Sequence, residues 1–402
     1  MNLHKLKNLI ENSKRPVVLA GSGIGISRTE KELLKFINKN SIPIVTAWAH
    51  DIYPNNDKYY YGRQGAIGNR VGNFVVQYAD LVLVLGSRLN IRQTSYNWKE
   101  FAKNAIIVSV DIDSLELKKN LIHIDYKIQM DLKIFFKNFN KIKIKTIDKS
   151  KNLKWFKWID WCNYIKKEFT PKIEDYKIYQ KKINVYHFII NLFKLLKKDE
   201  IIVAADGAAT VVPSQVGYLN KRNKFIANSG SASMGFELPG AIGASIANRK
   251  KKIICLAGDG SIMMNLQELE TIKSLNLNIV IFLINNGGYL SIKQTQKNFF
   301  GAEHGSSSES GLTFPNFIKI TNSFGIKSFN LKLKDWQSKL KKILNLKGPL
   351  FVNVNVDTKQ EFEPKLKSKT VNNKIVTPSL ENMYPFLTEE VNKKILKKLN
   401  AS

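Results

Sequence analysis

The sequence predicts an α/β fold made of two domains, each built on a doubly wound parallel sheet. Short apolar runs of strand length alternate with longer stretches of helical periodicity, and this alternation occurs twice along the chain. The apolar runs are hydrophobic throughout, which is typical of strands buried on both faces of a parallel sheet. The chain of 402 residues also exceeds the size at which one hydrophobic core is usual, so two domains are expected.

The first domain is predicted over residues 1–140. Residues 1–10 have an amphipathic helical pattern, with charges among the apolar positions and without the small-residue cleavage site of a signal peptide. Further helical patterns, such as Val71–Tyr78, separate the predicted strands and indicate a parallel sheet covered on both faces. The predicted strands are Pro16–Ala20, Pro43–Thr46, Leu81–Leu85 and Ile106–Val110.

A connector is predicted over residues 141–184. Lys, Asp and Asn crowd its first part, and a helical segment with Trp155, Trp158 and Trp161 follows. The i, i+3, i+6 spacing places the three indoles on one face of the helix. We interpret the segment as a linker helix that packs its aromatic face on a domain, in preference to a platform for nucleic-acid bases.

The second domain is predicted over residues 185–357 and repeats the alternation. It begins with a helical pattern at Val185–Leu196, and further helical patterns lie at about 234–247, 265–274 and 334–345. A tail over 358–402 is rich in Lys, Asn and Pro, and ends in an amphipathic helix at Glu389–Leu399. The predicted strands are Ile201–Ala205, Ile253–Ala257, Ile279–Ile284 and Leu350–Val354.

Composition and cysteine usage exclude several classes of protein. Hydrophobic residues make up 44% of the chain and charged residues 24%, which is typical of a soluble globular protein. No apolar run approaches the roughly 20 residues of a membrane-spanning helix, so no membrane partner is predicted. Of the two cysteines, Cys162 and Cys255, the second lies inside an apolar run. A buried thiol in a reducing, cytoplasmic protein is therefore predicted.

The formal net charge of +30 raises the alternative of a nucleic-acid partner. Lysines, however, are spread over every segment, and neither an arginine-rich run nor an aromatic RNA-binding motif occurs. We therefore predict no nucleic-acid partner, and expect the charge to steer anionic substrates and cofactors.

The sharpest motif is Gly258-Asp259-Gly260-Ser261, which directly follows a predicted strand. Loops at the carboxyl ends of parallel strands are where open α/β sheets bind ligands. Gly258 and Gly260 allow the backbone to approach an anion, and the start of the next helix offers N–H groups to phosphate. Asp259 is placed to hold a hard cation beside that phosphate. Taken alone, the Gly-Asp-Gly tripeptide favours an ordinary turn.

A second motif, Asn285-Asn286-Gly287-Gly288-Tyr289, follows the next strand. Asn286 lies 27 residues after Asp259, about the length of one strand–helix–strand step, so both emerge at the same end of the sheet. A carboxylate, an amide oxygen and a backbone carbonyl form an oxygen-only ligand set suited to Mg²⁺. The two motifs together predict a site for Mg²⁺ and phosphate.

At this spacing the two motifs resemble the signature of thiamine-diphosphate enzymes. The resemblance implies that Asp259, Asn286 and the main-chain oxygen of Gly288 bind Mg²⁺, and that the diphosphate lies on Gly260 and Ser261. The residues implied to contact thiamine diphosphate are Gly207, Ala208, Ser233, Met234, Gly258, Gly260, Ser261, Tyr289 and Leu290.

Two further segments carry the resemblance within the second domain. Residues 228–243 resemble a segment of acetolactate synthases in which a methionine lies beneath the cofactor and bends it, a role that would fall on Met234. A bulky, polarizable side chain suits such a role, although ordinary core filling is the alternative. Residues 206–209 follow a strand and resemble the remaining cofactor loop.

The first domain resembles the central, Rossmann-like domain of the same enzymes, through residues 20–23, 61–65 and 79–89. In acetolactate synthases this domain holds FAD, and in several relatives it does not. Here the Gly21-x-Gly-x-Gly25 run is not the full dinucleotide fingerprint, and no acidic residue about 20 residues later stands out as a ribose partner. A sheet-closing turn is therefore favoured over FAD binding.

The resemblance covers residues from about 5 to 357 and has three departures. Glu237 replaces a usual glycine, and residues 288–296 differ from biosynthetic acetolactate synthases. Both features look closer to acetolactate-synthase-like proteins of sugar and surface-polysaccharide pathways. The third departure is the N-terminal pyrimidine-binding domain, whose glutamate activates the cofactor. It is expected to be absent, because the central domain opens at residue 1.

The resemblance implies a thiamine-diphosphate-dependent lyase or transferase that decarboxylates or joins 2-keto acids. Its catalytic residue stays unassigned, because the activating glutamate is expected on another chain or upstream. We therefore expect an enzyme part that works as a homo-oligomer, such as a dimer, or with a pyrimidine-domain partner. The alternatives are a truncated remnant or regulatory protein that keeps cofactor binding, and a basic nucleic-acid-binding protein on an α/β scaffold.

Overall fold

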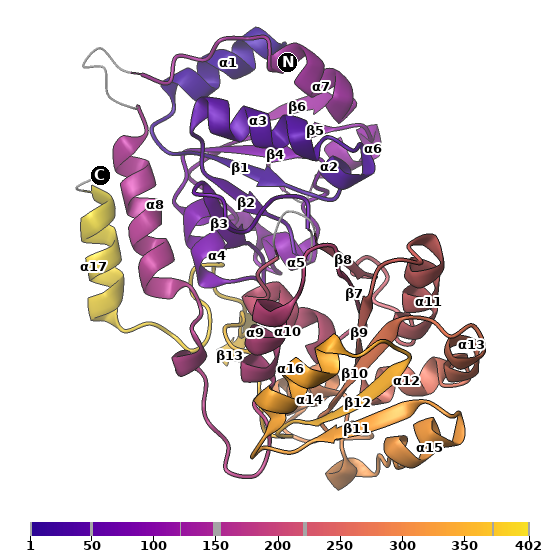
Figure 1. Cartoon of the computed structure of the whole chain (residues 1–402). Helices are drawn as coiled ribbons and strands as arrows, with labels where there is room; N and C mark the ends of the chain where they lie inside the picture. Colours follow the sequence, from indigo (N-terminus) through magenta and orange to yellow (C-terminus); the bar gives the residue numbers. More distant parts are fainter. Residues whose placement is uncertain are drawn as a thin grey trace. The chain divides into compact units, whose positions relative to one another are not determined.

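The computed structural model describes residues 2–48, 51–120, 122–147, 154–219, 223–371 and 374–400. The chain forms two compact units. The first comprises Met1–Pro171 together with Glu363–Ser402, and the second comprises Lys172–Phe362. Each unit has a parallel sheet with helices on both faces (Figure 1), so the predicted fold class is confirmed.

The first unit is built on a six-stranded parallel sheet in the order β3-β2-β1-β4-β5-β6. The central strands β1 and β4 are buried along their whole length, as expected for strands covered on both faces. The strands are β1 (Pro16–Ala20), β2 (Ile44–Thr46), β3 (Tyr60–Arg63), β4 (Leu81–Leu85), β5 (Ile106–Asp111) and β6 (Tyr126–Gln129). The helices are α1 (Leu3–Asn12), α2 (Gly23–Ile26), α3 (Glu30–Asn40), α4 (Arg70–Gln77), α5 (Ile91–Thr94), α6 (Ser114–Leu117), α7 (Leu132–Phe139), α8 (Phe156–Phe169) and α17 (Glu389–Asn400).

The glycine run after β1 packs against the turn that follows β4. Gly21 N donates to Leu85 O at 2.9 Å, and Gly23 N donates to Gly86 O at 2.9 Å. A Cβ at Gly21 would lie 2.3 Å from the Gly86 oxygen, so only glycine allows this approach. The close packing of two turns accounts for this glycine without a dinucleotide ligand.

The tryptophan-bearing helix α8, which we predicted as part of a connector, lies in the hydrophobic core of the first unit. Trp155, Trp158 and Trp161 are buried in that core together with Cys162 and Ile165. The i, i+3, i+4, i+7 spacing of the last four residues forms one apolar stripe that must be covered. The first unit therefore extends to Pro171, well into the predicted connector. Residues 148–153 of that connector lie outside the described residues.

Part of the predicted C-terminal tail also belongs to the first unit. Helix α17 packs beside α8, as Figure 1 shows, and Ile395 is buried between them. Each of the three indoles at Trp155, which caps α8, and at Trp158 and Trp161 within it also donates a hydrogen bond to a main-chain oxygen. The bonds run from Trp155 to Ser13 at 3.2 Å, from Trp158 to Pro16 at 3.0 Å and from Trp161 to Ile395 at 3.3 Å.

We expect Trp161→Phe to lower the free energy of unfolding by about 1–2 kcal/mol. The change removes the hydrogen bond to Ile395 and weakens the stack with Trp158, whose ring centroid lies 5.0 Å away. Urea denaturation measures the effect. Phe156→Leu on the same helix is the control, because Phe156 is 63% exposed and should change stability by roughly 0.5 kcal/mol or less. Equal losses in the two variants would contradict a core role for α8.

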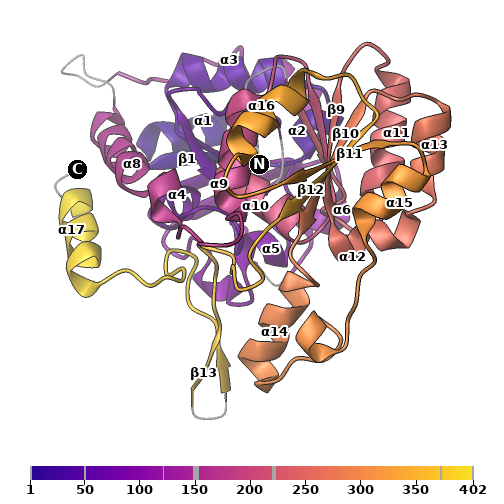
Figure 2. The same cartoon turned by 60° about the horizontal axis from the view of Figure 1, so that its bottom comes forward.

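The second unit is built on a six-stranded parallel sheet in the order β11-β12-β10-β9-β7-β8. Helices α11, α13 and α15 cover one face, and α9, α10 and α16 cover the other (Figure 2). The strands are β7 (Ile201–Ala204), β8 (Lys224–Ala227), β9 (Ile253–Gly258), β10 (Ile279–Asn285), β11 (Lys327–Leu331) and β12 (Leu350–Asn355). The helices are α9 (Val185–Leu195), α10 (Ala208–Val216), α11 (Glu237–Ala247), α12 (Asp259–Ile262), α13 (Glu268–Ser274), α14 (Leu290–Phe300), α15 (Phe317–Ser323) and α16 (Trp336–Asn345).

Six strands were not predicted: the edge strands β3, β6, β8 and β11, and the antiparallel pair β13 (Lys369–Val371) and β14 (Lys374–Val376). Each of the four edge strands is the outermost strand of a six-stranded sheet, and none is an unbroken apolar run. Gly62 interrupts β3, β6 has exposed residues on either side of one buried residue, and β11 includes exposed Lys327 and Asn330. Edge strands are half solvated, so they lack the continuous hydrophobic signal of central strands.

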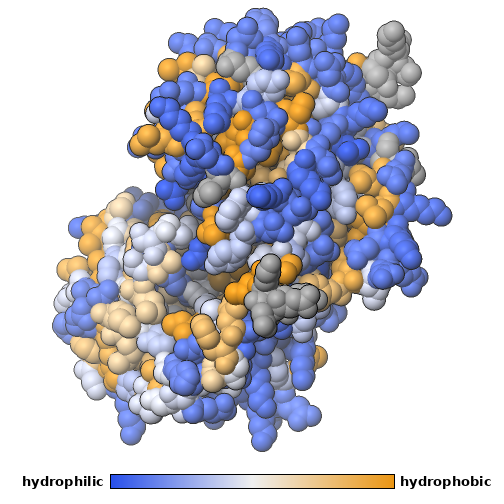
Figure 3. All heavy atoms as spheres, turned by 180° about the vertical axis from the view of Figure 1, so that it is seen from behind, coloured by the Kyte–Doolittle hydropathy of each residue, from blue (hydrophilic) through white to orange (hydrophobic). Residues whose placement is uncertain are grey.

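Several compositional expectations can be compared with the described residues. Both cysteines are buried free thiols, as predicted for Cys255. Hydrophilic residues cover much of the face seen in Figure 3, with smaller apolar groups between them. In the described part of the chain, no helix is both long and apolar enough to cross a membrane.

Candidate functional site

Most of the predicted site residues lie at the carboxyl ends of three inner strands of the second sheet. Strands β7, β9 and β10 are parallel neighbours, so the loops that follow them emerge side by side. Gly207 precedes α10, Gly258 ends β9, and Asn286 follows β10. Ala208 begins α10, Gly260 and Ser261 lie in α12, and Tyr289 and Leu290 open α14. The fold thus brings these three predicted loops together.

Asp259 ties two of these loops to each other. Its Oδ1 accepts a hydrogen bond from Gly260 N at 2.8 Å, and its Oδ2 accepts from Gly287 N at 2.6 Å and from Gly288 N at 3.3 Å. The residue is only 1% exposed, and this burial raises the pKa of Asp259 to about 6. No Lys or Arg among the described residues pairs with the carboxylate. A cation would supply the positive charge that a buried carboxylate needs.

Asn286 and Gly288 add oxygen ligands beside Asp259. One terminal atom of the Asn286 amide lies 3.2 Å from Asp259 Oδ2 and 2.7 Å from the Gly288 carbonyl oxygen. In the structure this atom is the amide oxygen, so three oxygens converge; if the amide is rotated, its nitrogen donates hydrogen bonds to both neighbours instead. The two separations from the Asn286 atom, 3.2 and 2.7 Å, lie on either side of the edge of roughly 2.9 Å in an octahedron with metal–oxygen bonds of about 2.1 Å. We call these three oxygens the oxygen triangle; they fit Mg²⁺.

Only one of the three oxygens in the triangle, the Asp259 carboxylate oxygen, is charged. Within the described ranges, no group of three His, Cys, Asp or Glu side chains is placed to hold a metal ion. One carboxylate, one amide and one backbone carbonyl leave half of an octahedral shell for other oxygens. Phosphate oxygens and water are the ligands that complete such shells for Mg²⁺.

Gly288 requires a conformation and a contact that only glycine tolerates. Its φ is +153°, and a Cβ would lie 2.1 Å from the carbonyl oxygen of Ser306. The neighbouring Tyr289 N donates to that same Ser306 oxygen at 2.9 Å, and Gly288 pairs with Ser307 in an isolated antiparallel bridge. The segment at 306–307 therefore holds the backbone that carries the third oxygen of the triangle.

We expect Gly288→Ala to weaken cation binding at least about tenfold, because the added methyl group must push the turn away from Ser306. Isothermal titration with MgCl₂ and thiamine diphosphate measures the change. Gly301→Ala is the matched control, since Gly301 also has a positive φ but meets nothing within 4 Å. If both variants bind the cation equally well, the contact with Ser306 does not position the ligand.

Glu237 is a site residue that we did not predict. Ser261 Oγ donates to Glu237 Oε2 at 2.8 Å and accepts from Gly235 N at 2.8 Å. Glu237 is 0% exposed, and Oε1 has no partner among the described residues. Burial, opposed by hydrogen bonds and reinforced by the charge of Asp206, raises the pKa of Glu237 to about 7. The one signal in the sequence was an acidic residue within an apolar helix, where the resembled family has glycine.

The contacts around Glu237 and Gly235 bear on three predicted cofactor residues, Ser233, Met234 and Ser261. The Ser261 hydroxyl is engaged by protein groups on both sides, so its predicted contact with diphosphate remains a prediction. Ser233 and Met234 lie in the loop between β8 and α11, and Asn265 Nδ2 holds this loop through Gly235 O at 2.9 Å. Met234 is 42% exposed, which argues against the alternative of core filling.

Comparison with known proteins agrees with this arrangement. The family description "Thiamine pyrophosphate enzyme, C-terminal TPP binding domain" matches residues 206–354, and "Thiamine pyrophosphate enzyme, central domain" matches residues 3–139. The chain belongs to the thiamine pyrophosphate enzyme family. The family predicted from the paired motifs is thus confirmed, and the whole oxygen triangle lies inside the matched C-terminal domain.

Named relatives of this chain are acetolactate synthases. The chain is 32% identical over 365 residues to the acetolactate synthase large subunit of Cyanidium caldarium, covering 90% of this chain and 61% of the relative. It is 31% identical over 368 residues to a probable acetolactate synthase large subunit of Methanococcus aeolicus, covering 88% and 60%. It is 29% identical over 378 residues to the isozyme 1 large subunit of Escherichia coli, covering 92% and 63%. The chain therefore spans about three fifths of the length of these relatives.

Proposed function

We propose that the chain binds thiamine diphosphate through Mg²⁺ and forms the cofactor-binding part of an acetolactate-synthase-like lyase or transferase that acts on 2-keto acids. The observation that carries the proposal is the oxygen triangle around Asp259, a buried carboxylate that pairs with no Lys or Arg of the described part of the chain. The names of the relatives support the substrate class.

Each loop at the sheet edge has a distinct task in this proposal. Asp259, Asn286 and the Gly288 carbonyl hold Mg²⁺, which neutralises the diphosphate. The N–H groups at the start of α10, beside Gly207, and the turn at Gly260 face the same edge and suit phosphate oxygens. Exposed Met234 supplies an apolar support for the cofactor rings. When bound, thiamine diphosphate supplies the electron sink for breaking the bond to a carboxylate.

The activating glutamate has no candidate among these loops. We propose that a pyrimidine-binding domain provides it, either elsewhere in the same polypeptide, on a second copy of the chain, or on a partner chain. A dimer and a cytoplasmic location are part of the proposal, and the two buried free thiols suit a reducing compartment. FAD binding in the first unit is not part of it.

Calorimetric titration with thiamine diphosphate, in MgCl₂ and in EDTA, tests cofactor binding. We expect saturable binding in MgCl₂ and none in EDTA, because the diphosphate needs the cation to approach Asp259. Absence of binding by folded protein, or binding unchanged by EDTA, would contradict the proposal. Release of CO₂ from pyruvate and other 2-keto acids then measures activity, with and without an added pyrimidine-binding domain. Binding without turnover in either case would favour a regulatory or non-catalytic protein.

A further inference from the structure

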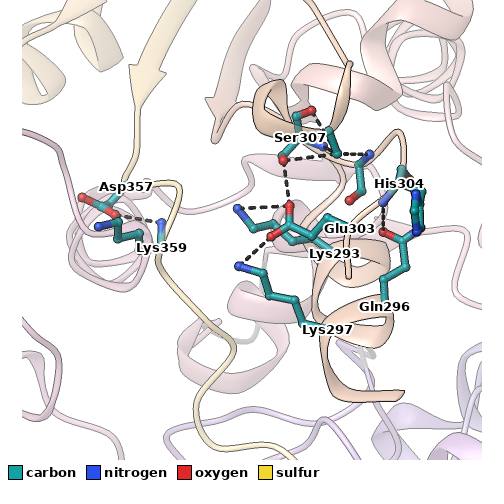
Figure 4. A network of polar contacts seen from close by, with 10 residues as sticks. Lys293, Gln296, Lys297, Glu303, His304, Ser307, Asp357 and Lys359 are labelled. Atoms are coloured by element: carbon teal, nitrogen blue, oxygen red, sulfur yellow. Dashed lines mark hydrogen bonds and ion pairs between the residues drawn. The ribbon is translucent and has the colours of Figure 1, made fainter. Parts of the chain in front are cut away.

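A cluster of charged residues lies on α14 and in the segment after it, which follow the turn at Gly288 in the chain. The Glu303 carboxylate lies 2.5 Å from Lys297 Nζ and 3.7 Å from Lys293 Nζ. Figure 4 shows both lysines directed toward Glu303. The side chains of Glu303 and Lys293 are only 9% and 15% exposed. The hydrogen bond from Lys297, followed by that from Ser307, lowers the pKa of the Glu303 carboxyl, so it is held ionised.

Glu303 is also joined to the segment that contacts the oxygen triangle. Its Oε2 accepts a hydrogen bond from Ser307 Oγ at 2.7 Å. Ser307 in turn pairs with Gly288, and Ser306 O accepts from Tyr289 N at 2.9 Å. These contacts connect the lysines of α14, through Glu303 and Ser307, to the backbone whose carbonyl is the third oxygen.

The same segment is fastened to α14 at a second point. Gln296 Nε2 donates to His304 O at 2.9 Å, and His304 N donates to Gln296 Oε1 at 3.1 Å (Figure 4). Exposed ion pairs usually contribute little to stability. Glu303 differs because it is mostly enclosed, and because it contacts two lysines and a hydroxyl group at once. Its arrangement suits the precise placement of a loop more than overall stability.

We propose that Glu303 is a positioning residue of the cation site, which acts through Ser307 to hold the Gly288 carbonyl oxygen in the oxygen triangle. The proposal rests on the proposed cation site. It states that the geometry of the Gly288 turn depends on Glu303 and its two lysines, which lie outside the Asp259 and Asn286 motifs. Because coupling between two sites is reciprocal, a cation on Gly288 also stabilises the segment 301–311.

Cation affinity tests the proposal, with Mn²⁺ as the probe. Free Mn²⁺ is measured by electron paramagnetic resonance during titration of the full chain in the presence of thiamine diphosphate. We expect Glu303→Gln and Ser307→Ala each to weaken Mn²⁺ binding about tenfold, the effect typical of residues that orient metal ligands. The double variant should be no weaker than the weaker single variant, because both changes break the same connection.

Glu309→Gln is the matched control, since Glu309 lies exposed in the same segment and loses the same charge. It should stay within about twofold of wild type. Hydrogen exchange gives a second readout: Mn²⁺ should slow exchange of residues 301–311 in wild type and in Glu309→Gln, but not in Glu303→Gln. Thermal unfolding without cation checks that each variant is folded.

Two outcomes would overturn the proposal and are distinguishable. If wild type binds Mn²⁺ and Glu303→Gln binds it equally well, Glu303 does not position the site. The same holds if the two single effects add in the double variant, because the residues then act independently. If wild type itself does not bind Mn²⁺, the cation site fails, and the positioning role fails with it.

Discussion

Asp259→Ala should abolish Mg²⁺-dependent binding of thiamine diphosphate, with a loss of affinity of at least about a hundredfold. Asp259 is the one carboxylate of the oxygen triangle, so its removal leaves the cation with neutral ligands only. The same change removes the carboxylate that accepts hydrogen bonds from the backbone N–H groups of Gly260, Gly287 and Gly288, and so holds the two loops together. Calorimetric titration of both proteins in MgCl₂ measures the loss.

Asp357→Ala provides the control for this loss. Asp357 follows β12 in the same sheet, and its Oδ1 accepts from Lys359 N at 2.8 Å (Figure 4). Its removal should leave cofactor affinity within about twofold of wild type. Circular dichroism of the cation-free proteins checks that both variants keep the fold. Unchanged cofactor affinity in the Asp259 variant would place the cation elsewhere.

Glu237→Gln should remove a large part of the pH dependence of stability. The pKa of Glu237 is raised from the ordinary 4.5 to about 7 in the folded protein, chiefly by burial. Its contribution is therefore fully present below pH 4.5 and is lost as the pH rises through 7. At about 1.4 kcal/mol for each pH unit, the loss is roughly 3 kcal/mol by pH 8.5. Glutamine keeps an acceptor for Ser261 and does not ionise.

Urea denaturation at pH 4.5 and pH 8.5 measures this effect. At pH 8.5 the variant should exceed wild type in free energy of unfolding by up to about 3 kcal/mol, while at pH 4.5 the two should be similar. Asp259 is a buried acid in both proteins, so its contribution cancels. Glu270→Gln, at an exposed position on α13, serves as the control and should follow wild type. An identical pH dependence in all three would show that Glu237 is ionised without cost.

The sequence was sufficient for the central strands of both sheets and for the meeting of the Asp259 and Asn286 loops. Strands such as β9 and β10 are buried on both faces, so their apolar runs stand out without knowledge of their neighbours. The motifs at Asp259 and Asn286 could be placed at one edge because parallel strands that follow each other through a helix share their direction. Both inferences use only the order of residues within short, neighbouring segments of the sequence.

The allocation of helices to the two units depended on tertiary contacts. The aromatic stripe of α8 predicts that the helix is covered, but it does not say by which part of the chain. The cover includes Ile395 on α17, more than 200 residues further along the chain. Contacts between such distant residues have no signature in local periodicity.

The details of the site were likewise decided only by the tertiary structure. Glu237 acquires its unusual proton affinity from complete burial and from Ser261, while Glu303 reaches Gly288 through Ser307. The sequence by itself determined which loops meet at the sheet edge and which oxygens they carry. The tertiary structure decided which side chains hold those loops in place, because burial and hydrogen-bond geometry arise only when separate segments pack together.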